Sequence, residues 1–409
     1  MNLYDKASLI LTPNAYKASK LYALKPTDGS GDLTVTRASA AYRRRSDGVL
    51  ESVANNVPRI HYPVGGACPA FLFESQRTNL KPRSLNWTNS TLALLRTTQT
   101  QSAVQPLFNA TALQIRETTD NNSHSFQLQP DATLVIGQVY TRSVYLKPTA
   151  NRQIFNIGDA GQTNSDAIVN VATKTIVGQG TNVSAIRFTD EAGGIVRVEV
   201  TFTATATIGR LSILHYISNT IFSYAGDVNE GVDIYHVQYE LGTTASSPII
   251  TEAATVTRTA DTATKGGLTS LIGQTQGTLF LDFIAPASGD TSDLVSLNQS
   301  YSNSVCLINV SGGLRAQIYS SQPLIQIMGP TIVANTRYKI ALRYNSGASV
   351  LTVNGVHYNS ASAFTFTGAL SSLDFTTGFY SGVRSPTRYN SVMVFPTLLT
   401  AAECVALTT

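Results

Sequence analysis

The side chains best suited to chemistry in this sequence are its histidines and carboxylates, and their spacing limits what they can do. The histidines are His61, His124, His215, His236 and His357. No two of them have the sequence spacing of a metal-ligand pair. We therefore expect each ring to be a surface or core side chain and predict no histidine metal site. Asp233 and Glu240 flank one strand-like segment, but their odd separation predicts opposite faces of that strand. No phosphate-binding loop or nucleophile elbow is present.

Cysteines and loop carboxylates also predict no cofactor. Cys68, Cys306 and Cys404 are far apart in the sequence, so we expect no disulfide framework, at least one unpaired cysteine and a chain that assembles in a reducing cytoplasm. Asp290 and Asp293, in the segment SGDTSDL, can supply oxygen ligands to calcium. Two acids in such a segment also suit an ordinary turn, so calcium remains an alternative and the prediction is that no metal binds.

Sugar binding is the molecular activity that the residue types favour, because sugars stack on aromatic rings and bond to amides and hydroxyls. The predicted glycan-binding residues, all near the C-terminal end, are Tyr301, Tyr319, Tyr380, Arg384 and Tyr389. The alternative is that these tyrosines are strand-surface or subunit contacts. Trp87 is the only tryptophan and is expected to fill a core or an interface.

Strands must position these residues, because helical periodicity is scarce. Only 13% of residues are charged, and hydroxyl and amide side chains replace the usual charges, as suits sandwiches with many turns. Val196, Val198, Val200 and Phe202 follow a two-residue period, which predicts one buried strand face. The sequence predicts an all-β protein with two tandem jelly-roll sandwiches, plus a short terminal helix over 401–407 that opens with a capping box.

Three parts are predicted: an irregular N-terminal attachment segment over 1–84, one sandwich over 85–265 and a second over 266–409. The first part carries a net charge of +6 and the rest −2. Its densest point is Arg43, Arg44 and Arg45, predicted to contact a partner, with a solvated loop as the alternative. Basic and aromatic residues do not alternate here, so we expect no nucleic-acid partner.

The tetrapeptide Thr-Val-Thr-Arg occurs twice, at 34–37 and 255–258. The two copies flank the first predicted sandwich, so we expect one to enter it and the other to leave it, near one sheet edge or junction. Arg37 and Arg258 are predicted to anchor a carboxylate or backbone carbonyls.

Residues 277–409 resemble laminin-G-like or concanavalin-A-like lectin domains. The segments that carry this resemblance are GTLFLDF, RYNSGASVLTVNG, and SVMVFP followed by LTAAECVAL. Residues 85–261 resemble the carbohydrate-binding-module-like sandwich of phage fibres, which ends in a strand of the type VDIYHVQYELG and a TVTRTAD phrase. The preceding PRIHYPVGGACPAFLFESQRTNL resembles the segment that introduces this module in tailed-phage virion proteins.

The resemblance implies a non-enzymatic structural protein of a tailed-phage virion, either capsid fibre or decoration or tail fibre, assembled in the host cytoplasm. Implied partners are other virion proteins, further copies in a trimer, and host cell-surface glycans. Glucanase relatives of the lectin-like fold carry E-x-D-x-x-E, but TLFLDFIAP has only Asp282. A receptor-binding lectin is the first alternative and a polysaccharide depolymerase the second. No stretch suits a membrane span or a signal peptide.

Overall fold

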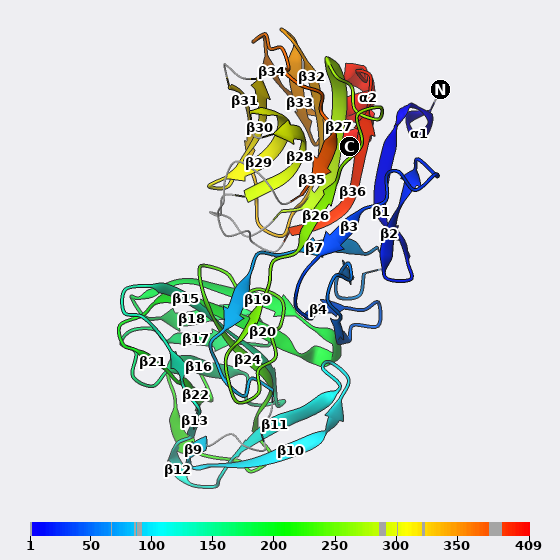
Figure 1. The fold of residues 1–409 in the computed structure, drawn as a ribbon. Helices are drawn as coiled ribbons and strands as arrows, with labels where there is room; N and C mark the ends of the chain where they lie inside the picture. Colours follow the sequence, from blue (N-terminus) through cyan, green and yellow to red (C-terminus); the bar gives the residue numbers. More distant parts are fainter. Residues whose placement is uncertain are drawn as a thin grey trace. The chain divides into compact units, whose positions relative to one another are not determined.

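The protein consists of two compact β-sandwich units (Figure 1). The computed structural model describes residues 2–66, 68–85, 87, 92–285, 292–300, 302–320, 324–375 and 387–409. Unit 1 comprises Met1–Arg43, Val53–Gln76 and Thr259–Thr409, and unit 2 comprises Arg44–Ser52 and Arg77–Arg258. The predicted all-β class with two sandwiches is confirmed.

Unit 2 contains two six-stranded antiparallel sheets. The first, called here the β24 sheet, has the order β10 (Thr97–Gln105), β11 (Ala110–Glu117), β24 (Gly231–Leu241), β15 (Val139–Pro148), β20 (Val196–Thr203) and β19 (Val183–Asp190). The second, the β16 sheet, has the order β18 (Thr175–Gln179), β17 (Ala167–Asn170), β16 (Ile154–Asp159), β22 (Leu211–Tyr216), β13 (Ser125–Leu128) and β9 (Leu92–Leu95).

Short elements complete unit 2. Two-stranded ladders join β12 (Asn121–Ser123) to β23 (Ser223–Ala225), β14 (Ala132–Thr133) to β21 (Ile208–Gly209), and β8 (Arg77–Asn79) to β25 (Val256–Arg258). A 3₁₀ turn, η1, covers Ala192–Gly194, and the hairpin of β4 (Ala41–Arg44) and β5 (Leu50–Val53) spans the boundary of the units in sequence.

The core of unit 2 lies between its two sheets and follows the predicted alternation. Val196, Val198, Val200 and Phe202 all pack in it, which confirms the two-residue period read from the sequence. Trp87 is 4% exposed in the same core and donates its indole N–H to the Thr111 carbonyl at 3.1 Å. The expectation that this tryptophan fills a core is confirmed.

A β-bulge overturns the expectation that Asp233 and Glu240 lie on opposite faces. Tyr145 pairs with His236 and the next residue, Leu146, pairs with Ile234, so β24 carries one extra residue at this point. Because of this extra residue, positions an odd number apart on the two sides of the bulge point to the same face of the sheet. Asp233 and Glu240 therefore both point away from the core, and each is bonded, to Arg116 at 2.8 Å and to the Ser246 amide at 2.8 Å respectively.

Unit 1 also contains two antiparallel sheets. One has the order β2 (Lys20–Lys25), β1 (Leu9–Lys17), β36 (Thr387–Phe395), β27 (Gln276–Ile284), β32 (Arg337–Asn345), β33 (Ser349–Val353) and β34 (Val356–Ser360), with β7 (Ala70–Phe73) beside β36 and β6 (Ile60–His61) beside β7. The other has the order β3 (Thr34–Thr36), β26 (Thr262–Lys265), β35 (Ser372–Asp374), β28 (Ser292–Ser300), β29 (Asn303–Val310), β30 (Gly313–Ser320) and β31 (Ile325–Thr331).

Two helices accompany these sheets, α1 (Leu3–Lys6) and α2 (Ala401–Thr408). The predicted capping box is present at α2: Thr400 accepts from the Glu403 amide at 3.2 Å, and Glu403 accepts from the Thr400 amide at 2.9 Å. In the described part of the chain, no helix has the length and apolar character needed to cross a membrane.

The predicted separate segment over 1–84 is corrected, because most of it belongs to unit 1. β1 pairs with β36, with Leu9 opposite Val394. Phe71 and Phe73, from β7, lie in the unit 1 core. The prolines do make the segment irregular locally, but its strands find their partners at the other end of the chain. The long segment of unit 2 runs over Arg77–Arg258, not over 85–265, and Arg44–Ser52 also belongs to that unit.

The repeated tetrapeptide forms two strands that pair with different partners. β3 pairs with β26 in unit 1, and β25 pairs with β8 in unit 2. Arg37 is 2% exposed and donates to Asp261 at 2.8 Å and to the Ala54 carbonyl at 2.7 Å, which confirms its predicted anchoring role. Arg258 is 1% exposed.

Candidate functional site

The predicted glycan-binding residues do not form a site among the described residues. Tyr301, Tyr380 and Arg384 lie outside the described part of the chain. Tyr389 is 1% exposed in the unit 1 core, and its hydroxyl donates to the Leu294 carbonyl at 2.8 Å. The prediction for Tyr389 is wrong, because the ring packs in the core against Phe73 and Phe375. Tyr319 is half-buried on β30.

The loop predicted to bind calcium is only partly described. Asp290 lies outside the described residues, and Asp293 is 5% exposed on β28. Within the described ranges, no group of three or more His, Cys, Asp or Glu side chains is placed to hold a metal ion.

The three predicted attachment arginines have different environments. Arg43 lies over the Tyr16 ring, 5.6 Å from its centroid. Arg44 is 5% exposed and forms an ion pair with Glu191, so it is corrected to a buried structural residue. Arg45 is exposed and pairs with Asp47 at 2.7 Å. Each of the three arginines thus contacts another side chain of the protein, and only Arg44 is buried.

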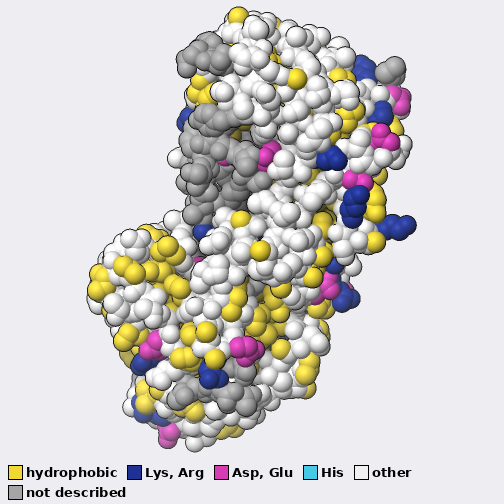
Figure 2. All heavy atoms as spheres, viewed as in Figure 1, with side chains coloured by type: hydrophobic (Ala, Val, Ile, Leu, Met, Phe, Trp, Pro, Cys, Tyr) yellow, Lys and Arg dark blue, Asp and Glu magenta, His cyan; other side chains and the backbone are white. Residues whose placement is uncertain are grey.

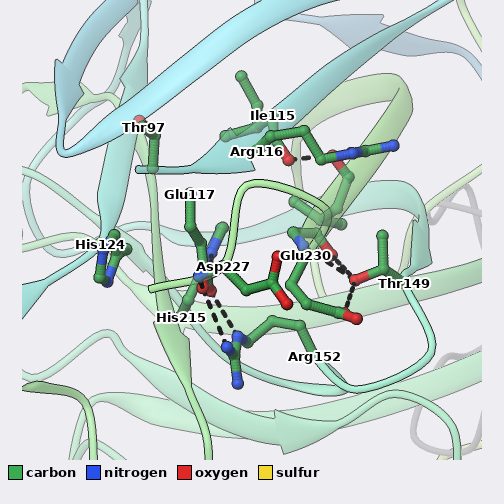
Figure 3. Close-up of polar contacts among 12 residues, drawn as sticks. Thr97, Ile115, Arg116, Glu117, His124, Thr149, Arg152, His215, Asp227 and Glu230 are labelled. Carbon is green, nitrogen blue, oxygen red and sulfur yellow. Dashed lines mark hydrogen bonds and ion pairs between the residues drawn. The ribbon is translucent and has the colours of Figure 1, made fainter. Parts of the chain in front are cut away.

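A cluster of titratable side chains surrounds Glu117, at the end of β11 (Figure 3). Arg152 binds both carboxylate oxygens, at 2.5 and 2.9 Å. Tyr224 donates its hydroxyl to the same carboxylate at 2.7 Å, and the Asp227 amide donates at 3.1 Å. His215 Nδ1 lies 3.2 Å from Oε1. Since a carboxylate only accepts, the shared proton sits on Nδ1.

These contacts make Glu117 a structural centre of unit 2 and leave it no catalytic freedom. Burial alone raises the pKa of Glu117, but hydrogen bonds from His215, Arg152 and Tyr224 outweigh it and hold the pKa far below the usual range. Burial lowers the pKa of His215, so the ring stays neutral. A general acid or base needs a pKa near the working pH and a free oxygen or nitrogen, and Glu117 has neither.

The outer face of the β24 sheet is covered by the chain itself. Gln238 accepts from the Ile249 amide at 2.7 Å, and Arg197 donates to the Ser246 carbonyl at 2.7 Å. His236, on the same face, is fully buried. The segment 243–252 thus covers part of this side of unit 2.

The outer face of the β16 sheet contains a hollow of about 360 Å³, called here the open-face hollow. Its floor comes from the adjacent strands β16, β22 and β13, where small side chains face outward. Gly158 on β16 pairs with Ser212 on β22, and β22 pairs on its other side with β13. A side chain at Gly158 would collide with the Asp166 carboxylate. The volume lies near the lower end of the roughly 300–1,000 Å³ of small-molecule sites.

Five polar side chains line the open-face hollow without a hydrogen bond or ion pair to any other described residue: Ser125, Gln127, Asn156, Asp166 and Ser212. The Asn156 side-chain oxygen is buried and has no partner in the described structure. Together the five side chains offer donors and acceptors to a hydroxyl-rich ligand.

Phe222 supplies the aromatic ring at the edge of the hollow. It is 46% exposed and lies in the loop between β22 and β23, with its ring 5.6 Å from that of Tyr216. The loop is closed by a hydrogen bond from the Ile217 amide to the Ile221 carbonyl at 3.0 Å. The pairing of β23 with β12 holds its far end. The ring is therefore positioned by backbone bonds while part of its surface stays free for contact.

Two carboxylates line the hollow, but only one is free. Asp159 forms an ion pair with Arg142 and accepts from the Tyr239 hydroxyl, and it is 4% exposed. Asp166 is half-buried and has no described partner. The hollow can thus bind through Asp166, Asn156 and the hydroxyls, and stack a ring on Phe222.

The sequence analysis did not identify these residues. Their signal is local and weak: in Ile-Phe-Asn-Ile-Gly-Asp, at 154–159, a polar residue and a glycine alternate with core residues. Such alternation is typical of any half-exposed strand. That three such strands lie side by side, all with small outward side chains, follows only from the sheet order.

Comparisons with known proteins give distant similarities only. No protein-family model matches the chain, and no curated protein matches it. Among solved structures, the carbohydrate-binding module CBM40 of the Ruminococcus gnavus IT-sialidase is 18% identical with a TM-score of 0.29, over 34% of this chain and 84% of that one. Domains LG4-5 of the mouse laminin alpha1 chain are 12% identical with a TM-score of 0.25, over 69% and 90%. Trypanosoma rangeli sialidase is 11% identical with a TM-score of 0.29, over 91% and 93%. With TM-scores below 0.5, none of these similarities assigns this chain a function.

Proposed function

We propose that this protein binds glycans without cleaving them, and that the open-face hollow of unit 2 is its binding site. The observation that carries the proposal is the set of five unbonded polar side chains beside one exposed aromatic ring on an uncovered sheet face. A sugar ring presents an apolar C–H face and a rim of hydroxyls. Phe222 matches the first, and the amides, hydroxyls and carboxylate of the floor match the second.

Binding without hydrolysis is the better match to the carboxylates. Glycosidases generally use two carboxyl groups that flank the scissile bond, one as acid and one as base or nucleophile. In the open-face hollow, both Asp159 oxygens are bonded to Arg142 and Tyr239, so only Asp166 is available. Incubating the protein with a bound polysaccharide and assaying reducing ends checks this point, and release of reducing ends would reinstate the depolymerase alternative.

The direct test is replacement of Phe222 by Ala in the full chain. Loss of a stacking ring costs about 1 kcal/mol or more, so binding to any glycan found on an array should weaken at least roughly fivefold. Ile136→Ala is the matched control, because Ile136 is 60% exposed in the same unit and does not line the hollow. Equal binding by wild type and Phe222→Ala would place the sugar site elsewhere.

The biological setting that we propose is a tailed-phage virion, as a fibre or decoration protein, in a trimer with other copies of this chain. It is supported by the sequence resemblance of residues 33–261 to virion proteins of that kind. Weak single sites suit such a setting, because many copies on one particle bind a glycan surface together. The test is labelling of purified particles with an antibody to this chain, and unlabelled particles would contradict the proposed setting.

A further inference from the structure

We infer that the open-face hollow selects sugars without a negative charge and rejects sugars that carry a carboxylate. The inference rests on the proposed glycan-binding function and adds the chemical class of the ligand. It starts from the charges that line the hollow, which among the described residues are two aspartates and no lysine or arginine. Sites that recognise carboxylates generally use arginine or lysine, often with two parallel hydrogen bonds from one guanidinium.

The cations near the hollow are already used by the protein. Arg142 lies beneath it, fully buried, where it pairs with Asp159 and donates to the Ile157 and Ser165 carbonyls, each at 2.5 Å. Its charge is thus balanced by Asp159, and its amino groups point at protein oxygens. Arg96 touches a lining residue at the edge, where it donates to the Ser123 carbonyl at 2.9 Å. Neither guanidinium offers a free pair of N–H groups to a ligand carboxylate.

Asp166 therefore sets the electrostatic character of the hollow. Its carboxylate has no described partner, and it lies directly over Gly158 in the floor. A sugar hydroxyl that donates to it gains a charge-assisted hydrogen bond. A sugar carboxylate brought to the same place meets a like charge in a partly desolvated site, where the repulsion exceeds its value in water. The same residue thus favours neutral sugars and disfavours acidic ones.

The experiment uses pairs of glycosides that differ only at C6, which carries either a hydroxyl or a carboxylate: glucoside and glucuronide, galactoside and galacturonide, mannoside and mannuronide. All are immobilised at equal density, and full-length protein is applied at low salt. In any pair that binds, we expect the neutral member to bind at least tenfold more tightly. Raising the salt concentration should narrow the ratio, because ions screen the repulsion.

The variant Asp166→Asn identifies the cause, and the neutral-to-acidic ratio is the readout. We expect the ratio to fall to about threefold or less, even though binding of the neutral member itself also weakens. Asp190→Asn is the matched control: Asp190 is exposed on β19, in the other sheet of the same unit, and should leave the ratio unchanged. Emission of Trp87, in the unit 2 core, shows whether each variant is folded.

The outcomes separate this inference from the function on which it rests. Equal or tighter binding of the acidic member by the wild type, or an unchanged ratio in Asp166→Asn, would overturn the charge selection and leave glycan binding in place. Binding to neither member of any pair would contradict the proposed function and this inference together. A reduced ratio in Asp166→Asn with an unchanged ratio in Asp190→Asn supports both.

Discussion

Replacement of Lys81 by Met should abolish a rise in the stability of unit 2 between neutral and alkaline pH. Lys81 is fully buried, and its ammonium group donates to two backbone carbonyls, those of Pro82 at 3.2 Å and Pro130. No ion pair to it forms among the described residues. Burial lowers the pKa of Lys81 to about 7, because the charged form has lost its water.

The magnitude follows from the difference between the folded and unfolded chains. An unfolded lysine has a pKa near 10.4, and the difference from the folded pKa of about 7 corresponds to about 4–5 kcal/mol of stability. Between pH 7 and 10.4 the unfolded chain binds more protons than the folded one, so stability rises with pH by up to about 1.4 kcal/mol per unit. Well below pH 7, Lys81 is protonated in both the folded and the unfolded chain, so it makes no contribution to the change of stability with pH.

Fluorescence of Trp87 provides the assay, because this single tryptophan lies in the unit 2 core. Urea unfolding is measured at pH 6, 7, 8 and 9 for the wild type, for Lys81→Met and for Lys147→Met, an exposed control in the same unit. We expect the wild type and the control to gain about 2–3 kcal/mol between pH 7 and 9, and Lys81→Met to lack this gain. A wild type without the rise, or a Lys81→Met variant that keeps it, would refute the assignment to Lys81.

Two further predictions concern buried carboxylates. Glu117→Gln should cost unit 2 about 3–5 kcal/mol at pH 7, because it leaves Arg152 buried without its partner. The pKa of Glu117 is depressed in the folded chain, so this stabilisation is present above the unfolded pKa near 4.3 and is lost as the pH falls below it. If the difference in unfolding free energy between wild type and Glu117→Gln, measured by Trp87 fluorescence, stays constant from pH 7 to 3, this prediction is contradicted. Asp261→Asn should cost unit 1 about 3–5 kcal/mol, since Asp261 neutralises both Arg37 and Arg59, and an unchanged calorimetric transition of unit 1 would argue against that role.

Local sequence was sufficient for the strand class and for several facings. Tyr338, Ile340, Leu342 and Tyr344 occupy every second position of β32, and all four lie in the unit 1 core. The hairpin turn at Gly347, with its positive φ of 78°, was also readable, because few residues other than glycine adopt that conformation easily. These features depend on neighbours within a few residues, so the sequence contains them directly.

Long-range pairing decided the rest. β1 pairs with β36, a strand from the opposite end of the chain, and no local pattern in either segment indicates this pairing. Tyr389 reads as a surface ring by residue type, but its strand is flanked by β27 and β7, and the ring packs inside. A single inserted residue in β24 reversed the facing of Glu240 relative to Asp233.

The open-face hollow shows the same division most clearly. Asn156 and Gly158 occupy outward positions of β16, and Ser125 and Ser212 occupy outward positions of β13 and β22. Sequence determined that these side chains are small or polar and face away from a core, because the two-residue period is a property of one strand. Only the tertiary structure decided that the three strands are neighbours and that no other described segment covers them, because sheet order depends on contacts between residues far apart in the chain.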